Sequence, residues 1–202
     1  MATGGEETVG YSLAKVGTVT LKSRTNKPWY ISIVVCQDKM VVIDINKCKV
    51  QLFRLHDGQF LATMDRLESI PSDLCLMDAK TICVLHSDGL IKMVSITDMS
   101  PVLKSTMDLR VQGLMDYYLG VVKFNDSLVV CGVKQDTAYW CVVSLHDGHV
   151  DAIHKICKWD GRWCCRVTTK DNIVYVACDA GVDNTGVYGF DISNPSQCKY
   201  KY

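Results

Sequence analysis

Two histidine–aspartate pairs are the first residues of this sequence whose types could do chemistry. His56 with Asp57, and His146 with Asp147, each lie in a Leu-His-Asp-Gly stretch that interrupts an apolar run. Because histidine and aspartate bind catalytic metal ions, one interpretation is a metal-dependent phosphohydrolase. The alternative is a hairpin corner. Asp-Gly is the favoured pair of a two-residue type I′ turn, in which both central residues need a positive φ.

A second set of metal-capable side chains lies between residues 149 and 165: His149, His154, Cys157, Cys164 and Cys165. A structural zinc site needs four such ligands, each about 2.0–2.3 Å from the metal. The spacing matches no standard zinc finger, and His149 and Cys165 fall at opposite ends of an expected hairpin. The interpretation without a metal is an outer strand, a Trp-Asp-Gly turn and the next inner strand. We therefore predict neither a metal nor a cofactor here.

The sequence also lacks patterns for covalent or phosphate chemistry. It contains no Gly-x-Ser-x-Gly nucleophile elbow and no glycine-rich phosphate loop. Asp44 and Asp191 end apolar runs singly, which suits turn caps better than an acid–base pair. We predict no catalytic residue and a non-enzymatic chain, and a hydrolase is kept as the second alternative.

Residues suited to binding a partner gather in the same part of the chain: Lys155, Lys158, Trp159, Arg162, Trp163 and Arg166. Tryptophan and arginine dominate protein–protein hot spots and also stack on nucleobases. Three roles are considered for this set: contact with a protein partner, RNA binding, and filling of the core by Trp163. Tyr117 and Tyr118 are further candidates because they begin an expected inner strand, as Trp29 and Tyr30 do earlier. Packing is the preferred interpretation for both aromatic pairs.

The composition argues against several classes of partner. The 202 residues include 22 basic and 22 acidic side chains, so no net charge attracts nucleic acid or anionic lipid. The apolar runs are too short for a membrane span of about 20 residues, and the first ten residues do not form a secretory signal. Eleven scattered cysteines favour a reducing cytosol over a disulfide scaffold. The expected partner is a protein and the alternative is RNA; no membrane and no small-molecule substrate is expected.

Candidate residues are positioned by strands that repeat along the chain. Four apolar runs, at 38–45, 79–87, 125–133 and 171–179, recur about every 41–46 residues. Further short apolar runs flank each of them. A repeat of roughly 40–50 residues that holds four strands is typical of a β-propeller blade. The runs are apolar on both faces, as expected for strands sandwiched between neighbouring blades, whereas a two-sheet sandwich would alternate. The sequence therefore predicts an all-β propeller of about four blades.

The predicted organisation is a flexible N-terminus over 1–11 followed by the propeller over 12–202. The propeller consists of a lone strand at 12–24 and blades at 29–67, 69–110, 112–158 and 162–202. The two His-Asp-Gly triplets then fall between third and fourth strands, two blades apart, so their histidines cannot share a metal. Turn chemistry is the preferred interpretation. Four blades would either close into a ring or form an incomplete part of a six-bladed one.

Two stretches carry a resemblance to a known family: WYISIVVCQDKMVVIDINKCKVQLFRLHDGQFL at 29–61 and SIPSDLCLMDAKTICVLHSDGLIKMVSI at 69–96. Their pattern resembles the NHL-type repeats of tripartite-motif proteins, particularly the diverged invertebrate kind, over about residues 12–192. The resemblance implies a module that selects substrates for ubiquitin transfer, and some NHL propellers bind RNA on a basic face. The RING, B-boxes and coiled coil of those proteins have no counterpart in this sequence. Any ligase activity would belong to a longer relative or to another chain.

Overall fold

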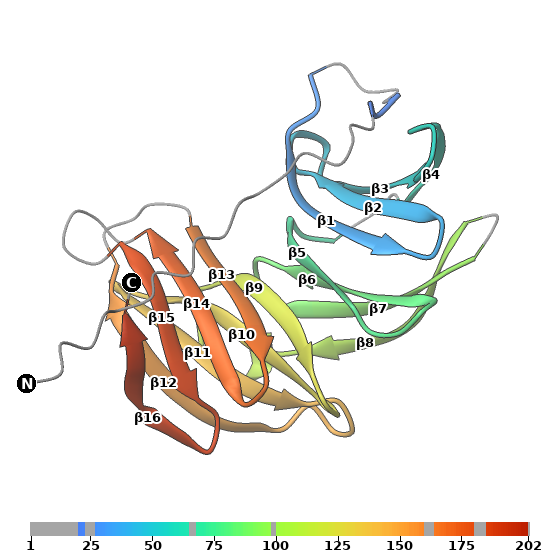
Figure 1. Cartoon of the computed structure of the whole chain (residues 1–202). Coiled ribbons are helices and arrows are strands. Elements are labelled where there is room, and N and C mark those ends of the chain that lie inside the picture. The colour runs from blue at the N-terminus through green and yellow to red at the C-terminus, as the bar shows by residue number, and fades with distance from the viewer. Residues whose placement is uncertain are drawn as a thin grey trace, which may run out of the picture.

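The computed structural model describes residues 20–22, 27–64, 68–97, 100–159, 164–179 and 185–201. Most of these residues belong to four antiparallel, four-stranded sheets that follow one another in chain order (Figure 1). The sheets are the blades of a β-propeller, so the predicted all-β fold of about four blades is confirmed. No helix in the described ranges is long and apolar enough to cross a membrane.

Each blade is a meander in which consecutive strands pair as antiparallel neighbours. Blade 1 contains β1 (Tyr30–Cys36), β2 (Lys39–Asp44), the 3₁₀ turn η1 (Ile45–Lys47), β3 (Lys49–Arg54) and β4 (Phe60–Met64). Blade 2 contains β5 (Pro71–Leu76), β6 (Thr81–His86), β7 (Leu90–Ile96) and β8 (Pro101–Asp108). Blade 3 follows the 3₁₀ turn η2 (Arg110–Gln112) and contains β9 (Tyr117–Phe124), β10 (Ser127–Lys134), β11 (Thr137–Ser144) and β12 (Val150–Lys158). Blade 4 contains β13 (Cys164–Lys170), β14 (Ile173–Asp179), β15 (Gly186–Asp191) and β16 (Asn194–Lys201).

The first strand of every blade lies nearest the propeller axis. β1 packs beside β5, β5 beside β9, and β9 beside β13. The fourth strands, β4, β8, β12 and β16, lie at the opposite edges of their sheets and form the periphery. A residue's place in its blade therefore decides whether it faces the axis or the outside.

Strands in the middle of a blade are dry on both faces, as the sequence predicts. Val129 and Val130 are adjacent in β10, so their side chains point to opposite faces of the sheet. Both are fully buried, Val129 in the core shared with blade 4 and Val130 in the core shared with blade 2. In blade 1, Val41 and Val42 divide in the same way between two apolar clusters. Burial on both faces explains why these runs contain so few polar residues.

Three apolar cores join the blades in order. The first joins blade 1 to blade 2, the second joins blade 2 to blade 3, and the third joins blade 3 to blade 4. Within the described residues, no such core joins blade 4 back to blade 1. Figure 1 shows these two sheets as the separate ends of a fan. The described blades therefore pack as an open arc.

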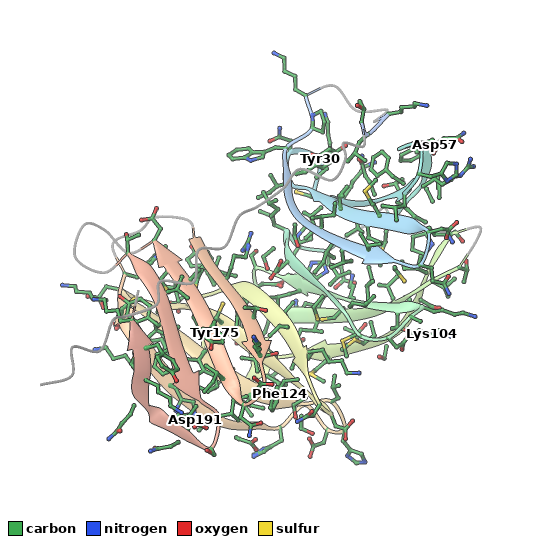
Figure 2. The ribbon with its side chains drawn as sticks, viewed as in Figure 1. Tyr30, Asp57, Lys104, Phe124, Tyr175 and Asp191 are labelled. Carbon is green, nitrogen blue, oxygen red and sulfur yellow. The ribbon has the colours of Figure 1, made fainter. Side chains whose placement is uncertain are left out.

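The Leu-His-Asp-Gly stretches are hairpin corners, as predicted, but the predicted type I′ turn is wrong. Residues 55–58 form a four-residue loop, closed by bonds from Gly58 N–H to Arg54 O (3.0 Å) and from Arg54 N–H to Gln59 O (2.8 Å). Only Gly58 takes a positive φ, of 67°. The Asp57 carboxylate accepts the Gln59 N–H at 3.0 Å, which fixes the corner without a left-handed aspartate. Figure 2 shows Asp57 at the outer end of blade 1.

The second stretch repeats this loop in blade 3. Gly148 N–H bonds to Ser144 O at 3.0 Å, and Gly148 has a φ of 73°. The Asp147 carboxylate accepts the His149 N–H at 3.0 Å. The Leu-His-Asp-Gly stretch therefore occurs twice because the same four-residue loop joins the third and fourth strands of blades 1 and 3.

The predicted lone strand at 12–24 falls largely outside the described residues, as does the predicted N-terminus at 1–11. Of that strand, only residues 20–22 are described. Lys22 forms a parallel bridge with Gln59 of blade 1, and its N–H bonds to Gly58 O at 2.9 Å.

Candidate functional site

A cavity of about 500 Å³ opens at the propeller axis, at the end where the inner strands begin. All four blades contribute to its lining: Trp29, Ile31, Ile45, Ile70, Pro71, Ser72, Ser87, Leu119 and Arg166. The links from one blade to the next reach the surface at this end, because each inner strand starts there. We call this opening the axis cavity.

The mouth of the axis cavity carries large apolar side chains that water still reaches. Trp29 is 63% exposed and Ile70 is 47% exposed. The backbone of Trp29 is held in place, because its N–H donates to Asp44 Oδ1 (3.2 Å) and its carbonyl accepts from Ile45 N–H (3.0 Å). A fixed backbone with an exposed indole ring presents an anchor for a partner at little entropic cost.

Among the described lining residues, Arg166 is the one with a charged side chain, and it connects three blades. Its Nη1 donates to Leu119 O of blade 3 (2.6 Å) and to Cys165 O of blade 4 (3.3 Å). Its Nη2 donates to Ile31 O of blade 1 at 3.4 Å. The guanidinium therefore fixes the spacing of the inner strands around the cavity.

Asp73, on β5, provides a second polar junction next to the cavity. Its Oδ1 accepts the Ser32 hydroxyl of blade 1 at 2.7 Å, and its Oδ2 accepts the Val121 N–H of blade 3 at 3.0 Å. The residue is only 6% exposed. Burial raises the pKa of this carboxyl above its ordinary value, while the nearby Arg166 charge and these hydrogen bonds act in the opposite direction. Arg166 and Asp73 together connect all four inner strands.

The described members of the predicted basic and aromatic set lie in different parts of the fold. Lys155 and Lys158 are exposed on β12, the peripheral strand of blade 3. Trp159 is half-buried against the core between blades 3 and 4. Arg166 lies on the inner strand of blade 4, at the axis. Predicted residues Arg162 and Trp163 lie outside the described residues.

The predicted tyrosine pair divides between solvent and core. Tyr117 is 53% exposed at the start of β9. Tyr118 is buried between blades 2 and 3, where its hydroxyl donates to Leu109 O at 3.4 Å. Its ring packs against Gly89, where a Cβ would lie 2.6 Å from Tyr118 Cε2. Burial raises the pKa of Tyr118 to about 12. Tyr118 therefore packs in the core, whereas Tyr117 is exposed, and a partner contact by Tyr117 stays a prediction.

The described metal-capable residues near 149–165 lie in different settings. The His154 ring packs against the Trp140 ring, with centroids 4.6 Å apart and planes tilted by 40°, and burial lowers the pKa of this imidazole. Cys157 and Cys165 lie in the core between blades 3 and 4, and His149 lies at an exposed corner. Among the described side chains, no three histidine, cysteine or acidic residues could hold a metal ion.

Sequence reasoning missed most of the axis cavity. Trp29 was matched to Tyr117 by its place in the repeat but was expected to pack, and Ile70, Leu119 and Asp73 carried no signal. The residues just before and at the start of the inner strands are the positions that could have identified the cavity, because the inner strands lie nearest the axis.

Comparison with known proteins supports the fold and leaves the activity open. No protein-family model matches the chain, and neither does any curated protein. Among solved structures, the WD40 repeats of RRP9 match with a TM-score of 0.65 at 13% identity, over 89% of this chain and 52% of that one. The chain thus spans about half the length of that propeller.

Two further structures show how little the fold says about activity. Glutaminyl cyclase from Myxococcus xanthus matches with a TM-score of 0.57 at 12% identity, over 85% of this chain and 69% of that one. The computationally designed Ika4 protein matches with a TM-score of 0.54 at 16% identity, over 89% of this chain and 99% of that one. At such identities the likeness concerns the propeller alone.

Proposed function

We propose that this propeller is a non-enzymatic protein-interaction module whose axis cavity receives an apolar side chain of a protein partner. The observation that carries the proposal is the exposed pair Trp29 and Ile70 at the mouth of a mainly apolar cavity. Tryptophan is the residue type most enriched at binding hot spots, and such anchors work best in preformed pockets.

The hydrogen bonds of Arg166 support a rigid cavity. Its guanidinium already donates to three backbone carbonyls. An arginine so occupied positions the walls and adds positive potential, which favours a partner with a carboxylate beside its apolar side chain. Rigid walls reduce the entropy lost on binding.

RNA binding is the alternative function for the predicted basic set. It would have to use Lys155 and Lys158 on the periphery, since Arg166 lies at the axis and is engaged with the backbone. RNA affinity would fall steeply with salt through counterion release, whereas an apolar protein contact would change little.

The NHL-type resemblance extends the proposal to substrate selection in ubiquitin transfer. In that role the propeller would present its bound partner to a RING carried by another part of the protein or another chain. The resemblance of residues 29–61 and 69–96 is its support, and the WD40 likeness is equally compatible with other scaffolds.

Affinity capture with the immobilised chain tests the proposal. RNase-treated cell extract is passed over the wild-type chain and over Trp29→Ala, Ile70→Asp and Leu103→Ala. Leu103 is a matched control because it is 50% exposed on β8 and is not among the described lining residues of the axis cavity. We expect specific partners that the two cavity variants lose and Leu103→Ala retains. Partners captured equally by all four proteins, or lost on RNase treatment, would refute the axis cavity as a protein-binding site.

A further inference from the structure

A second groove, of about 660 Å³, lies between blades 2 and 3, away from the axis cavity. Its apolar lining includes three methionines from blade 2: Met77, Met93 and Met107. All three are half-buried, and their inner sides pack on the core between the two blades. The groove is thus an accessible extension of that core.

Methionine gives this groove an adaptable surface. Its unbranched thioether side chain fills irregular gaps and is characteristic of surfaces that accept varied apolar partners. Val111 adds a further apolar side chain at the rim and is 82% exposed. A groove of this composition favours aliphatic side chains without fixing one shape.

The rim of the groove is acidic. Three aspartates line it, Asp78, Asp108 and Asp147, and none of its described lining residues is a lysine or arginine. Asp78 accepts the Lys80 N–H at 2.8 Å and Asp147 accepts the His149 N–H at 3.0 Å, bonds that lower the pKa of both carboxyls. Both are therefore ionised at neutral pH.

Nearby cations neutralise only part of this charge. Arg110 pairs with Asp108 at 2.6 Å, and Lys123 Nζ donates to Met77 O at 2.7 Å. Figure 2 shows Lys104 extending outward from β8. In the described part of the chain, neither Asp78 nor Asp147 has a lysine or arginine partner within ion-pair distance.

The groove follows the edge of a peripheral strand. Four consecutive residues of β8, from 105 to 108, line it. Because successive side chains of a strand point to opposite faces, a groove touched by four in a row runs along the strand's edge. β8 pairs only with β7 among the described strands, so this edge can pair with an extended peptide.

We propose that this groove binds an extended peptide segment of a protein partner in which lysine or arginine alternates with aliphatic residues. The aliphatic side chains contact the methionines, the cationic side chains face Asp78 and Asp147, and the peptide backbone follows β8. The acidic rim disfavours RNA at this position. The inference rests on the proposed function and adds a second, chemically different contact to the axis cavity.

Fluorescence anisotropy with two synthetic probes tests the groove. The first probe is a labelled nine-residue peptide that alternates lysine with leucine, and the second has glutamate in place of lysine. Titrated with the purified full chain at low salt, the lysine peptide is expected to bind at least about tenfold more tightly. Equal affinities for the two probes would overturn the proposal.

Variants with exposed side chains locate the binding. We expect the Val111→Lys variant to bind the lysine peptide about tenfold more weakly than the wild type. The double variant Asp78→Asn with Asp147→Asn should show a similar loss of affinity. The controls are Val102→Lys, an exposed position of β8 outside the groove lining, and Asp136→Asn, at the other end of β11. The controls are expected to bind as the wild type. If the Val111→Lys variant binds the lysine peptide as tightly as the wild type, the proposal that the peptide binds in the groove is wrong.

Two further measurements separate the possible explanations. Trp29→Ala should leave the peptide affinity unchanged, because the axis cavity is a different site; a loss in this variant would overturn the groove. If the peptide fails to bind while Trp29→Ala still loses its captured partners, the groove is wrong and the proposed function stands. If Val111→Lys instead dissolves a dimer in sedimentation analysis, the occupant is a second copy of this chain and the peptide proposal is wrong.

Discussion

The hydroxyl of Ser32, on the inner strand of blade 1, donates a hydrogen bond of 2.7 Å to the buried carboxylate of Asp73 on the inner strand of blade 2. The same Ser32 oxygen accepts the Leu74 N–H at 3.2 Å. The second carboxylate oxygen of Asp73 accepts the Val121 N–H of blade 3. One acidic side chain thus joins three blades beside the axis cavity, at a place where an apolar residue would leave polar groups unpaired.

Asp73→Ala is expected to destabilise the protein by about 1–3 kcal/mol. The substitution leaves the buried Val121 N–H and the half-buried Ser32 hydroxyl without their acceptor, and such orphaned groups cost about this much. Urea unfolding followed by circular dichroism measures the change. Ser32→Ala removes the hydroxyl that donates to Asp73 Oδ1 and accepts the Leu74 N–H, so it should destabilise the protein as well. A stability of Asp73→Ala equal to that of the wild type would contradict the assigned bonds.

The stability difference between Asp73→Asn and the wild type should depend on pH. Asparagine can still accept the Val121 N–H and can donate to Ser32 Oγ, but it cannot ionise. Burial raises the pKa of Asp73 in the folded protein above its unfolded value near 3.9. The stabilisation that Asp73 provides is therefore fully present below about pH 3.9. As the pH rises through the folded pKa, the wild type loses this stabilisation relative to the variant. Unfolding midpoints compared from acid to neutral pH would show no such divergence if Asp73 titrates normally.

Arg166→Lys is expected to destabilise the arc by about 1–2 kcal/mol even though the charge is kept. A lysine ammonium cannot reproduce the planar fork that reaches Leu119 O and Ile31 O at once. Chemical denaturation gives the stability. Lys170→Arg, at the other end of β13, is a control that should have little effect. Equal stability of Arg166→Lys and the wild type would mean that these bonds do not hold the inner strands.

Substitution by alanine is expected to reduce stability by very different amounts at two glycines, Gly132 and Gly113. A Cβ at Gly132, in the β9–β10 pair, would collide with the Tyr117 carbonyl oxygen and lie 2.7 Å from Met115 Sδ. A Cβ at Gly113 meets nothing within 4 Å, although its φ of 59° is unfavourable for alanine. We expect Gly132→Ala to cost about 3 kcal/mol or more and Gly113→Ala about 1 kcal/mol. Thermal unfolding of the two variants checks the order, and similar costs would contradict it.

The blades were predictable because burial on both faces leaves a clear trace in sequence. Val129 and Val130 must both be apolar, since neighbouring blades cover the two faces of β10. The turn type was not predictable in the same way. The turn type of the Leu-His-Asp-Gly corners depends on which backbone carbonyl accepts the glycine N–H. The sequence pattern does not determine this partner, so it does not predict a loop of four residues.

The candidate site shows a similar division. Arg166 was identified by residue type, but Lys155, close to it in sequence, lies on the outermost strand of the preceding blade while Arg166 lies on an innermost one. The fourth strand of one blade and the first strand of the next are consecutive in sequence but lie at different distances from the axis. The sequence pattern does not show how far Lys155 and Arg166 lie from that axis. Trp29 and Arg166 line one cavity only because the four inner strands lie side by side at the axis. Whether the predicted set binds a partner stays a prediction.

Cysteine reactivity should report the packing of the blades. Cys198 is exposed on the peripheral strand β16, whereas Cys141 is fully buried in β11. Burial raises the pKa of the Cys141 thiol to about 12, and alkylation requires the thiolate. We expect brief iodoacetamide treatment of the folded protein near pH 8 to modify Cys198 first and to spare Cys141. Peptide mass spectrometry locates the modified sites.

Unfolding provides the reference for this experiment, because all eleven cysteines should react similarly once the chain is denatured in urea. Cys165 and Cys178, whose sulfur atoms lie 3.5 Å apart in the core between blades 3 and 4, should become reactive only when those blades separate. Their modification at sub-denaturing urea, before that of Cys141, would indicate that blade 4 opens as a unit. Modification of Cys141 in native protein as fast as that of Cys198 would contradict the packing between blades 2 and 3.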